Sequence, residues 1–343
     1  MKNLGLWNKI VFFLNSLFAI ALLIGYTLPY FPPKVFPPIS VLTLIIPALL
    51  ATNVIFVIYW LLLFKKQFLL SGLILVLWLF IGTTLYNFSS GIPVQNVEQA
   101  SEDLSIFSYN VHVFTSDKFD KEQIREGVLE LINTNAPDIL TFQEFSKHNS
   151  PNFKNYKYSY LGNETVARNF GQAIYSKYPI INQGSLDFKA TFNNGIFVDI
   201  VKAQDTIRIY NMHMQTLTLT PELNALEKED TKSLVGRLGR AFKKQQEQTD
   251  IFLEHQKNSP YKTIIAGDFN NTAFSYTYNK IRGSRRDAFE EKGSGFGRTF
   301  IFDIIPLRID FILPDESYDV KAFENFDVGY SDHFPIMAIV TTK

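Results

Sequence analysis

Residues 263–270 are Thr263-Ile264-Ile265-Ala266-Gly267-Asp268-Phe269-Asn270, an apolar run that breaks off at a glycine and two polar residues. Short β-branched runs bounded by glycine are typical of buried strands, so we expect a strand over residues 263–266 with Asp268 and Asn270 at its exit. An aspartate after a glycine most often serves a turn or caps a helix. Asp268 alone therefore indicates no particular chemistry.

Other apolar runs also contain or end in a single functional side chain. An acid inside such a run is costly unless it is paired, so Asp310 indicates a functional partner even when taken alone. Glu144, in contrast, is by itself most often a solvated surface residue. The five further runs are Phe107-Ser108-Tyr109-Asn110-Val111, Thr141-Phe142-Gln143-Glu144, Tyr210-Asn211-Met212-His213, Arg308-Ile309-Asp310-Phe311-Ile312 and Ser331-Asp332-His333-Phe334-Pro335.

The larger, C-terminal part of the chain alternates β-type runs with helical stretches. We expect helices over residues 119–134 and 222–257, the second interrupted around Gly236 and Gly239. Many strands with few helices are best accommodated by two packed sheets covered by helices, which predicts an α/β fold. The expected strands are 104–114, 138–142, 171–176, 196–202, 207–212, 263–266, 308–313, 318–323 and 335–340.

Taken in order, the six motifs resemble those of the endonuclease/exonuclease/phosphatase superfamily. That superfamily includes the pancreatic deoxyribonuclease type, abasic-site endonucleases, neutral sphingomyelinases and inositol-polyphosphate phosphatases. Each motif alone is weak, but six in this order, each in or closing an apolar strand, are specific, and they span residues 104–340. The resemblance implies a four-layer α/β sandwich, two packed β-sheets flanked by helices, as a catalytic domain over residues 104–343.

The chain has no cysteine, so a metal ion requires oxygen or imidazole ligands. Phosphoester hydrolysis needs charge neutralisation at the phosphoryl oxygens and an activated water. Mg²⁺ takes one or two carboxylates together with amide oxygens and waters. Glu144 and Asn110 supply such a set, and the resemblance adds Asp332. We therefore expect Mg²⁺ or Mn²⁺ at these three residues.

Five further residues are expected to carry catalysis. His333 can act as the general base if a carboxylate fixes its tautomer, and the resemblance gives that role to Asp310. Asp268 and Asn270 can both face the attacking water and the phosphate. His213 is expected to donate a hydrogen bond to a non-bridging phosphoryl oxygen. The residues leave open whether Asp268 or His333 takes the proton.

His112 shares a face with Asn110 by the strand period, and we expect it only to pack or to support the site. One stretch departs from the superfamily. Nuclease members of the superfamily usually carry a Tyr, Glu or Arg that supports the phosphate-binding histidine. The corresponding stretch here is Arg168-Asn169-Phe170-Gly171-Gln172, which offers no evident partner, so the substrate subclass stays open.

The first 97 residues contain no acid and only five lysines. Three uncharged apolar runs, at residues 10–30, 39–64 and 67–87, each reach the roughly 20 residues that a helix needs to cross a bilayer. The sequence therefore predicts three transmembrane helices within residues 1–90, followed by a linker over residues 91–103. A cleaved signal peptide fits less well, because no small-x-small cleavage site is evident and two more long runs follow.

The lysines flank the apolar runs unequally. Lys2, Lys9, Lys65 and Lys66 fall on one side, and Lys34 falls on the other. Because cytoplasmic flanks are rich in Lys and Arg, we expect a multi-pass protein of the cytoplasmic membrane with its catalytic domain on the outer, periplasmic or extracellular side. A flexible tether of about 16 residues would reach roughly 20–25 Å from the bilayer.

These features predict a metal-dependent phosphoesterase whose partners are the lipid bilayer and a phosphoester, either a lipid head group or a nucleic acid. A membrane-tethered nuclease is the alternative. The part after the five lysines disfavours it, because 28 basic and 33 acidic residues give a formal charge of −5. An inactive binding or scaffold module is disfavoured by the complete set of site residues. Five basic residues that we expect near anionic head groups are Lys232, Arg237, Arg240, Lys243 and Lys244.

Overall fold

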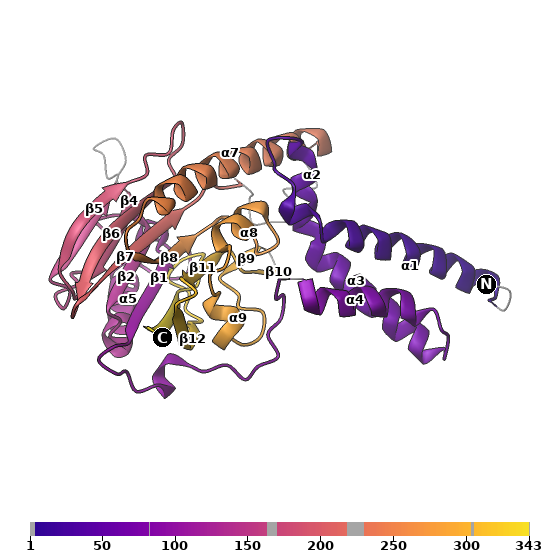
Figure 1. Ribbon diagram of the computed structural model, residues 1–343, viewed down its shortest axis with the longest axis horizontal. Helices are drawn as coiled ribbons and strands as arrows, with labels where there is room; N and C mark the ends of the chain where they lie inside the picture. Colours follow the sequence, from indigo (N-terminus) through magenta and orange to yellow (C-terminus); the bar gives the residue numbers. More distant parts are fainter. Residues whose placement is uncertain (1–3, 82, 163–169, 218–229, 303–304, 343) are drawn as a thin grey trace.

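The computed structural model describes residues 4–81, 83–162, 170–217, 230–302 and 305–342. A group of apolar helices lies at one end of the elongated molecule, and an α/β domain occupies the other end (Figure 1). The N-terminus lies at the far end of the helices, whereas the C-terminus lies within the α/β domain. The chain is thus divided into an apolar helical part and a strand-rich part.

The first sheet of the α/β domain has six strands in the order β12-β13-β1-β2-β4-β3. β1 pairs in parallel with β2 and antiparallel with β13, so the sheet is mixed. Every residue of β1 is buried, as expected for a central strand covered on both faces. The strands are β1 (Leu104–Asn110), β2 (Ile139–Phe145), β3 (Tyr158–Gly162), β4 (Gly171–Ser176), β12 (Tyr318–Asn325) and β13 (Ile336–Thr342).

The second sheet has five strands in the order β11-β8-β7-β6-β5. β7 and β8 run in parallel, and their neighbours are antiparallel. A short hairpin of β9 (Phe300–Phe302) and β10 (Ile305–Leu307) precedes β11. The five strands are β5 (Ile180–Ser185), β6 (Asn194–Lys202), β7 (Asp205–His213), β8 (Lys262–Asp268) and β11 (Asp310–Pro314).

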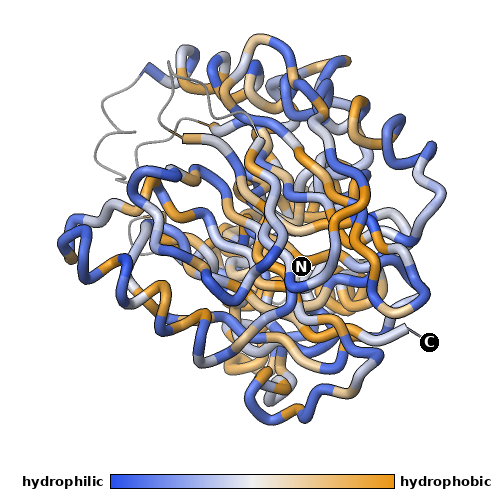
Figure 2. Tube along the Cα trace, turned by 90° about the vertical axis from the view of Figure 1, so that its left-hand side faces the viewer, coloured by the Kyte–Doolittle hydropathy of each residue, from blue (hydrophilic) through white to orange (hydrophobic). Residues whose placement is uncertain are grey.

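The two sheets share one apolar core, in which Ile106 and Ile139 of the first sheet belong to the same buried cluster as Ile209 and Ile264 of the second. The outer face of the first sheet packs under α5 (Lys121–Asn135), and that of the second under α7 (Thr231–Lys257) and α8 (Tyr276–Arg282). Figure 2, which looks along the long axis, shows hydrophobic segments toward the centre and more hydrophilic segments around the rim. The predicted sandwich of two sheets flanked by helices is confirmed.

The first predicted strand and the last predicted helix differ most from the structure. β1 ends at Asn110, four residues early, because the chain turns sharply over His112–Phe114. α7 runs from Thr231 to Lys257 without interruption, since Gly236 and Gly239 are accommodated inside it. Residues 222–229 of that predicted helix lie outside the described residues.

The N-terminal helices are α1 (Leu6–Gly25), α2 (Pro37–Val41), α3 (Ile46–Leu62) and α4 (Phe68–Ile81). Two stretches, Leu6–Tyr30 and Pro37–Leu62, are long and apolar enough to cross a membrane. The predicted count of three spans is not supported, because the 14 residues of α4 rise only about 21 Å against a hydrocarbon core of about 30 Å. The apolar run continues beyond α4, but at Thr84 the chain already bonds to Glu290 of the α/β domain.

A buried polar network joins three of these helices. Asn15 of α1 donates to Ser71 of α4 at 2.5 Å, and Ser71 donates to Asn53 of α3 at 2.7 Å. Trp60 of α3 donates its indole N–H to Asn15 at 2.9 Å. Such bonds between apolar helices fix their register, because the polar groups have no water as an alternative partner.

The helices dock directly on the α/β domain. Gly239 of α7 lies against Pro37 of α2, and the backbone N–H of Lys34 donates to Gln246 of α7 at 2.8 Å. The ring of Trp78 in α4 lies 5.6 Å from that of Phe274, which follows β8.

The segment between α4 and β1 also lies on the domain. Asn87 pairs with Gly295 through two backbone bonds of 2.8 and 2.9 Å, and the N–H groups of Ile92 and Phe323 donate to Lys292 and Ile92 respectively. The expectation of a flexible tether is therefore wrong, because the segment is hydrogen-bonded to the domain along its first half.

The close approach of β7 and β8 leaves no room for a side chain at Gly267. Its φ is +136°, and an added Cβ would overlap the backbone of Met212. We expect Gly267→Ala to destabilise the full-length protein in detergent by roughly 3 kcal/mol or more, measured by chemical denaturation followed by circular dichroism. Gly236→Ala, in the open helix α7, should instead stabilise by about 0.5–1 kcal/mol. Equal stability of Gly267→Ala and the unchanged protein would contradict this reasoning.

Candidate active site

The carboxyl ends of parallel strands from both sheets meet at one edge of the sandwich. β1 ends at Asn110 and its parallel neighbour β2 carries Glu144, whereas β7 and β8 end at His213 and Asp268. β11 runs antiparallel to β8, so its first residue, Asp310, lies directly opposite Asp268. The topology therefore gathers side chains that are far apart in the sequence.

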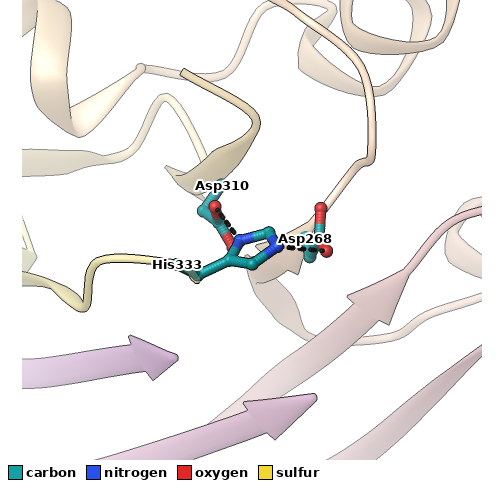
Figure 3. Close-up of side chains that lie close together, drawn as sticks. All are labelled: Asp268, Asp310 and His333. Carbon is teal, nitrogen blue, oxygen red and sulfur yellow. Dashed lines mark hydrogen bonds and ion pairs between the residues drawn. The ribbon is translucent and has the colours of Figure 1, made fainter. Parts of the chain in front are cut away.

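His333 lies between two buried aspartates (Figure 3). Its Nδ1 is 2.9 Å from Oδ2 of Asp310, and its Nε2 is 3.7 Å from Oδ2 of Asp268. Asp310 accepts a hydrogen bond from Nδ1–H, and this bond turns Nε2 toward Asp268. The exposed fractions of Asp268, Asp310 and His333 are only 0%, 3% and 5%, so the three groups interact with little solvent screening.

The electrostatics of this trio favour a shared proton. Burial lowers the pKa of His333, but the carboxylates of Asp310 and Asp268 outweigh it and raise the pKa to about 10. Burial raises the pKa of Asp268 to about 6, against the opposing charge of His333. Because the two groups interact strongly, the proton belongs to the Asp268–His333 pair rather than to one residue.

Amides hold Asp268 in place. Asn110 donates its side-chain N–H to Oδ2 at 3.0 Å, and Asn270 donates its backbone N–H to Oδ1 at 2.7 Å. The side chain of Asn270 adds a bond of 3.2 Å to Oδ2. Nε2 of His213 lies 3.8 Å from both Asp268 and Glu144, so this ring borders the two groups of acids.

The residues that the sequence predicts as metal ligands lie in the same region. The side-chain nitrogen of Asn110 lies 3.5 Å from Oε1 of Glu144, and its oxygen accepts from the N–H of His112. Nδ1 of His112 lies 3.3 Å from Oδ1 of Asp332 and 3.7 Å from Oε2 of Glu144. Carboxylates such as these two fit a hard divalent cation. The Asp268, Asp310 and His333 trio also has ligand atoms within 4.8 Å of one another. Its ring stands between the two acids, an arrangement better suited to proton transfer than to a shared ion.

His112 contacts two of the predicted metal ligands. It was expected to pack or to support the site, and Nδ1 of its half-exposed ring lies 3.3 Å from Asp332 and 3.7 Å from Glu144. A hydrogen bond to Asp332 raises the pKa of His112, and His112 and His333 together hold the pKa of Asp332 well below its usual range although burial opposes this. The spacing of two from Asn110 was the available signal.

A second polar network lies beneath the site, between the sheets. Gln143, beside Glu144, donates to the side chain of Asn211 at 2.7 Å, and Asn211 donates to the carbonyl oxygens of Phe142 and Ala173 at 2.8 and 3.0 Å. Gln172 donates to the backbone of Asn211 at 3.0 Å. Residues 168 and 169 of the stretch in which we sought a partner for the phosphate-binding histidine lie outside the described residues. The hydrogen bonds of Asn211 thus fix the position of β7, and with it that of His213, relative to β2.

An open pocket of about 900 Å³ adjoins the site and includes His112 and Asp332 in its wall. Arg298 and Phe334 line this pocket and also a neighbouring one, of about 360 Å³, whose wall includes the apolar Phe296. A substrate therefore has access to the polar residues from a surface that carries both charged and aromatic side chains.

The arrangement of paired strand ends and acid–imidazole side chains has a counterpart among known proteins. A family model described as endonuclease/exonuclease/phosphatase family matches residues 107–333. The chain belongs to this family. Members are generally hydrolases of phosphoesters, usually with divalent metals, so the broad activity class follows from membership. A second model, described as a domain of unknown function, matches residues 8–84, and a comparison with curated proteins finds no match.

Solved structures of the endonuclease/exonuclease/phosphatase family share the α/β fold of this chain. Humanized D. rerio TDP2 is 17% identical with a TM-score of 0.53, and the match covers 71% of this chain and 100% of that one. A family protein from Bacteroides vulgatus is 16% identical with a TM-score of 0.55, covering 70% and 99%. The human Nocturnin catalytic domain, with bound sulfate, is 15% identical with a TM-score of 0.54, covering 72% and 97%. At these identities the likeness establishes the fold and not the substrate.

Proposed function

We propose that this protein is a metal-dependent phosphoesterase that acts on a lipid head group at the outer face of a membrane. One observation carries the hydrolytic part of the proposal. The imidazole of His333 is held between the buried Asp268 and Asp310, and the side-chain N–H of Asn110 donates to Asp268 beside the carboxylate of Glu144. Such a site combines proton transfer with charge neutralisation, the two requirements of phosphoester hydrolysis.

Each side chain has a role in the reaction. Asn110, Glu144 and Asp332 would hold Mg²⁺ or Mn²⁺, which when bound neutralises charge on the phosphoryl oxygens. As the water oxygen bonds to phosphorus, its proton passes to the carboxylate of Asp268, while Asp310 stabilises the imidazolium of His333.

The remaining groups position the substrate and complete the reaction. The amide of Asn270 orients the attacking water, and His213 donates to a non-bridging oxygen. The bond to the leaving oxygen breaks, and that oxygen takes up a proton from the Asp268–His333 pair, which returns to its starting state.

The exposed surface of the helices supports the membrane assignment. Large apolar side chains cover it, far more than a soluble protein leaves in contact with water. The hydrocarbon core of a bilayer would keep these side chains out of contact with water. Examples are Leu6, Trp7, Phe13, Phe64, Leu73, Leu79 and Phe80, which are 77%, 68%, 62%, 96%, 66%, 78% and 82% exposed.

The direction in which the site faces supports a substrate in the membrane. The chain continues from Asp268 to Phe274, whose ring meets Trp78 of α4, and from His213 to Leu217, which packs with the end of α2. The strand ends that carry the site therefore face the helices. Phe296, in the pocket beside the site, also contacts Tyr86 of the segment after α4, with ring centroids 4.9 Å apart.

Loss of the metal or of the proton-handling pair should abolish activity. In the full-length protein, a chelator should stop phosphodiester hydrolysis and added Mg²⁺ or Mn²⁺ should restore it. Asp268→Asn and His333→Ala should each lower kcat by about a hundredfold or more, because each removes one half of the pair. His148→Ala, an exposed histidine outside the site, should leave kcat unchanged. Full turnover in excess chelator would contradict the proposal.

The helix directions predict the side on which the domain lies. Lys34 forms an ion pair with Asp250 of α7 at 2.6 Å, so it lies at the catalytic end of the helices, whereas Lys9, Lys65 and Lys66 lie toward the opposite end. The lysine-rich end should face the cytoplasm. A reporter fused after Lys343 that is active only outside the cytoplasm should therefore give a signal, and a signal from a cytoplasm-only reporter would reverse the orientation.

The substrate class can be tested with the anchor intact. In vesicles, the protein should hydrolyse anionic phospholipid, and replacing Lys232, Arg240 and Lys243 of α7 with Gln should lower that rate about fivefold or more, since one basic side chain contributes about 1 kcal/mol near a membrane. Hydrolysis of a soluble chromogenic diester should not change. Lys154→Gln with Lys157→Gln, on a loop before β3, is the control. If the protein cleaves nucleic acid but no lipid, a membrane-tethered nuclease is favoured. If it hydrolyses none of these substrates, a scaffold module is favoured.

A further inference from the structure

Three aromatic side chains form an exposed patch where the segment after α4 meets the α/β domain. The ring centroid of Tyr86 lies 4.8 Å from that of Phe88 and 4.9 Å from that of Phe296. The three residues are 42%, 90% and 49% exposed, respectively. Apolar side chains that are exposed singly are common on proteins, but a contiguous group marks an interaction surface. We call Tyr86, Phe88 and Phe296 the aromatic patch.

The backbone beneath the aromatic patch is fixed. Asn87 exchanges two backbone hydrogen bonds with Gly295, and its side chain donates to the carbonyl oxygen of Phe289 at 3.1 Å. Phe296 stands in a turn between Gly295 and Gly297, whose φ values are +66° and +59°. An added Cβ at Gly297 would overlap the ring of Phe289, so only glycine fits there. The turn therefore holds the ring of Phe296 in a partly exposed position.

The aromatic patch adjoins the pockets beside the site. Phe296 lines the pocket of about 360 Å³, and Arg298 and Phe334 line both this pocket and the larger one. The wall of the larger pocket includes His112 and Asp332. A molecule that lies against the aromatic patch can therefore extend through adjoining pockets to the polar residues of the site.

The aromatic patch is also continuous with the surface of the helices. A small pocket of about 50 Å³ where helices and domain meet is lined by Phe296 together with Pro47 of α3 and Leu85. At the same end of the helices, the loop between α1 and α2 exposes Tyr30 and Phe36. Aromatic side chains near the ends of membrane-spanning helices lie at the level of the lipid head groups. The bilayer that would cover the helices therefore also reaches the aromatic patch.

We propose that the aromatic patch is a membrane contact of the catalytic domain, and that a lipid substrate passes over Phe296 into the adjoining pockets. The inference deepens the proposed function, because it assigns the route by which a lipid presents its phosphoester to the site. The hydrocarbon chains stay against the aromatic rings, whereas the head group enters the pockets. Aromatic rings suit this boundary because one part contacts hydrocarbon while another contacts the wet head-group layer.

The position of the aromatic patch can be measured without any substrate turnover. The chain has no cysteine, so one introduced cysteine carries a nitroxide label at a single position. Phe88→Cys and Phe296→Cys are labelled in the full-length protein, in vesicles of phosphatidylcholine and phosphatidylglycerol. Electron paramagnetic resonance compares collisions of the label with oxygen, which concentrates in lipid, and with a water-soluble nickel chelate. The control is Ile181→Cys, an exposed apolar position on β5, at the end of the molecule away from the helices (Figure 1).

We expect the ratio of oxygen to nickel collisions at positions 88 and 296 to exceed that at position 181 at least about threefold, because only the first two meet the lipid. Equal ratios at the three positions would overturn the proposal. Labels at 88 and 296 that neither reagent reaches would overturn it as well, because a second copy of the chain would then cover the aromatic patch.

The route of the substrate is tested by hydrolysis. Phe88→Ser should lower the rate on vesicle phospholipid, relative to that on a soluble chromogenic diester, at least about fivefold, since it removes an apolar contact with the lipid. Ile181→Ser should leave this ratio as it is in the unchanged protein. An unchanged ratio in Phe88→Ser would overturn the route. If the labels meet lipid but the protein hydrolyses no phosphoester, the hydrolase proposal fails while the membrane contact stands.

Discussion

The meeting of Asp268 and Asp310 is the constraint on which the site depends. The two acids lie directly opposite each other on β8 and β11, buried in an otherwise apolar sandwich. Like charges in that position repel and have almost no water to screen them. The imidazole of His333 resolves the conflict because it reaches both carboxylates. The segment that brings His333 to this place, between β12 and β13, is therefore as necessary to the site as the strands themselves.

Buried ion pairs also anchor the strand that carries Asp310. Arg308, two residues before Asp310, is buried and donates to Asp287 at 2.6 Å, and Asp287 also accepts a bond from Tyr278. A buried arginine is tolerable only with such a partner. Glu290 lies 4.0 Å from Arg308 and accepts a bond from the backbone of Thr84. A chain of hydrogen bonds and ion pairs thus runs from Thr84, after α4, to Arg308, just before β11.

Much of this could be predicted from the sequence, because it depends on local signals. The acid inside Ile309-Asp310-Phe311 announced an ionic partner, and polar residues at the ends of apolar runs marked the edge where parallel strands meet. The position of His112 beside Glu144 and Asp332 could not be predicted, since it follows from the left-handed turn after β1. The contacts of Thr84 and Asn87 were also invisible, because their partners lie about 200 residues away and involve backbone atoms.

The docking of the helices also predicts how a protein truncated before β1 would behave in solution. Pro37 covers Gly239, the end of α2 covers Leu238 and Phe242, and Trp78 covers Phe274. Cutting the chain before β1 would bare these apolar residues to water and leave the carboxylate of Glu290 without the Thr84 N–H. A soluble fragment would consequently be prone to self-association. Its oligomeric state would then reflect the apolar surface exposed by truncation and not a property of the full-length protein. The helices therefore shield apolar residues of the catalytic domain from water.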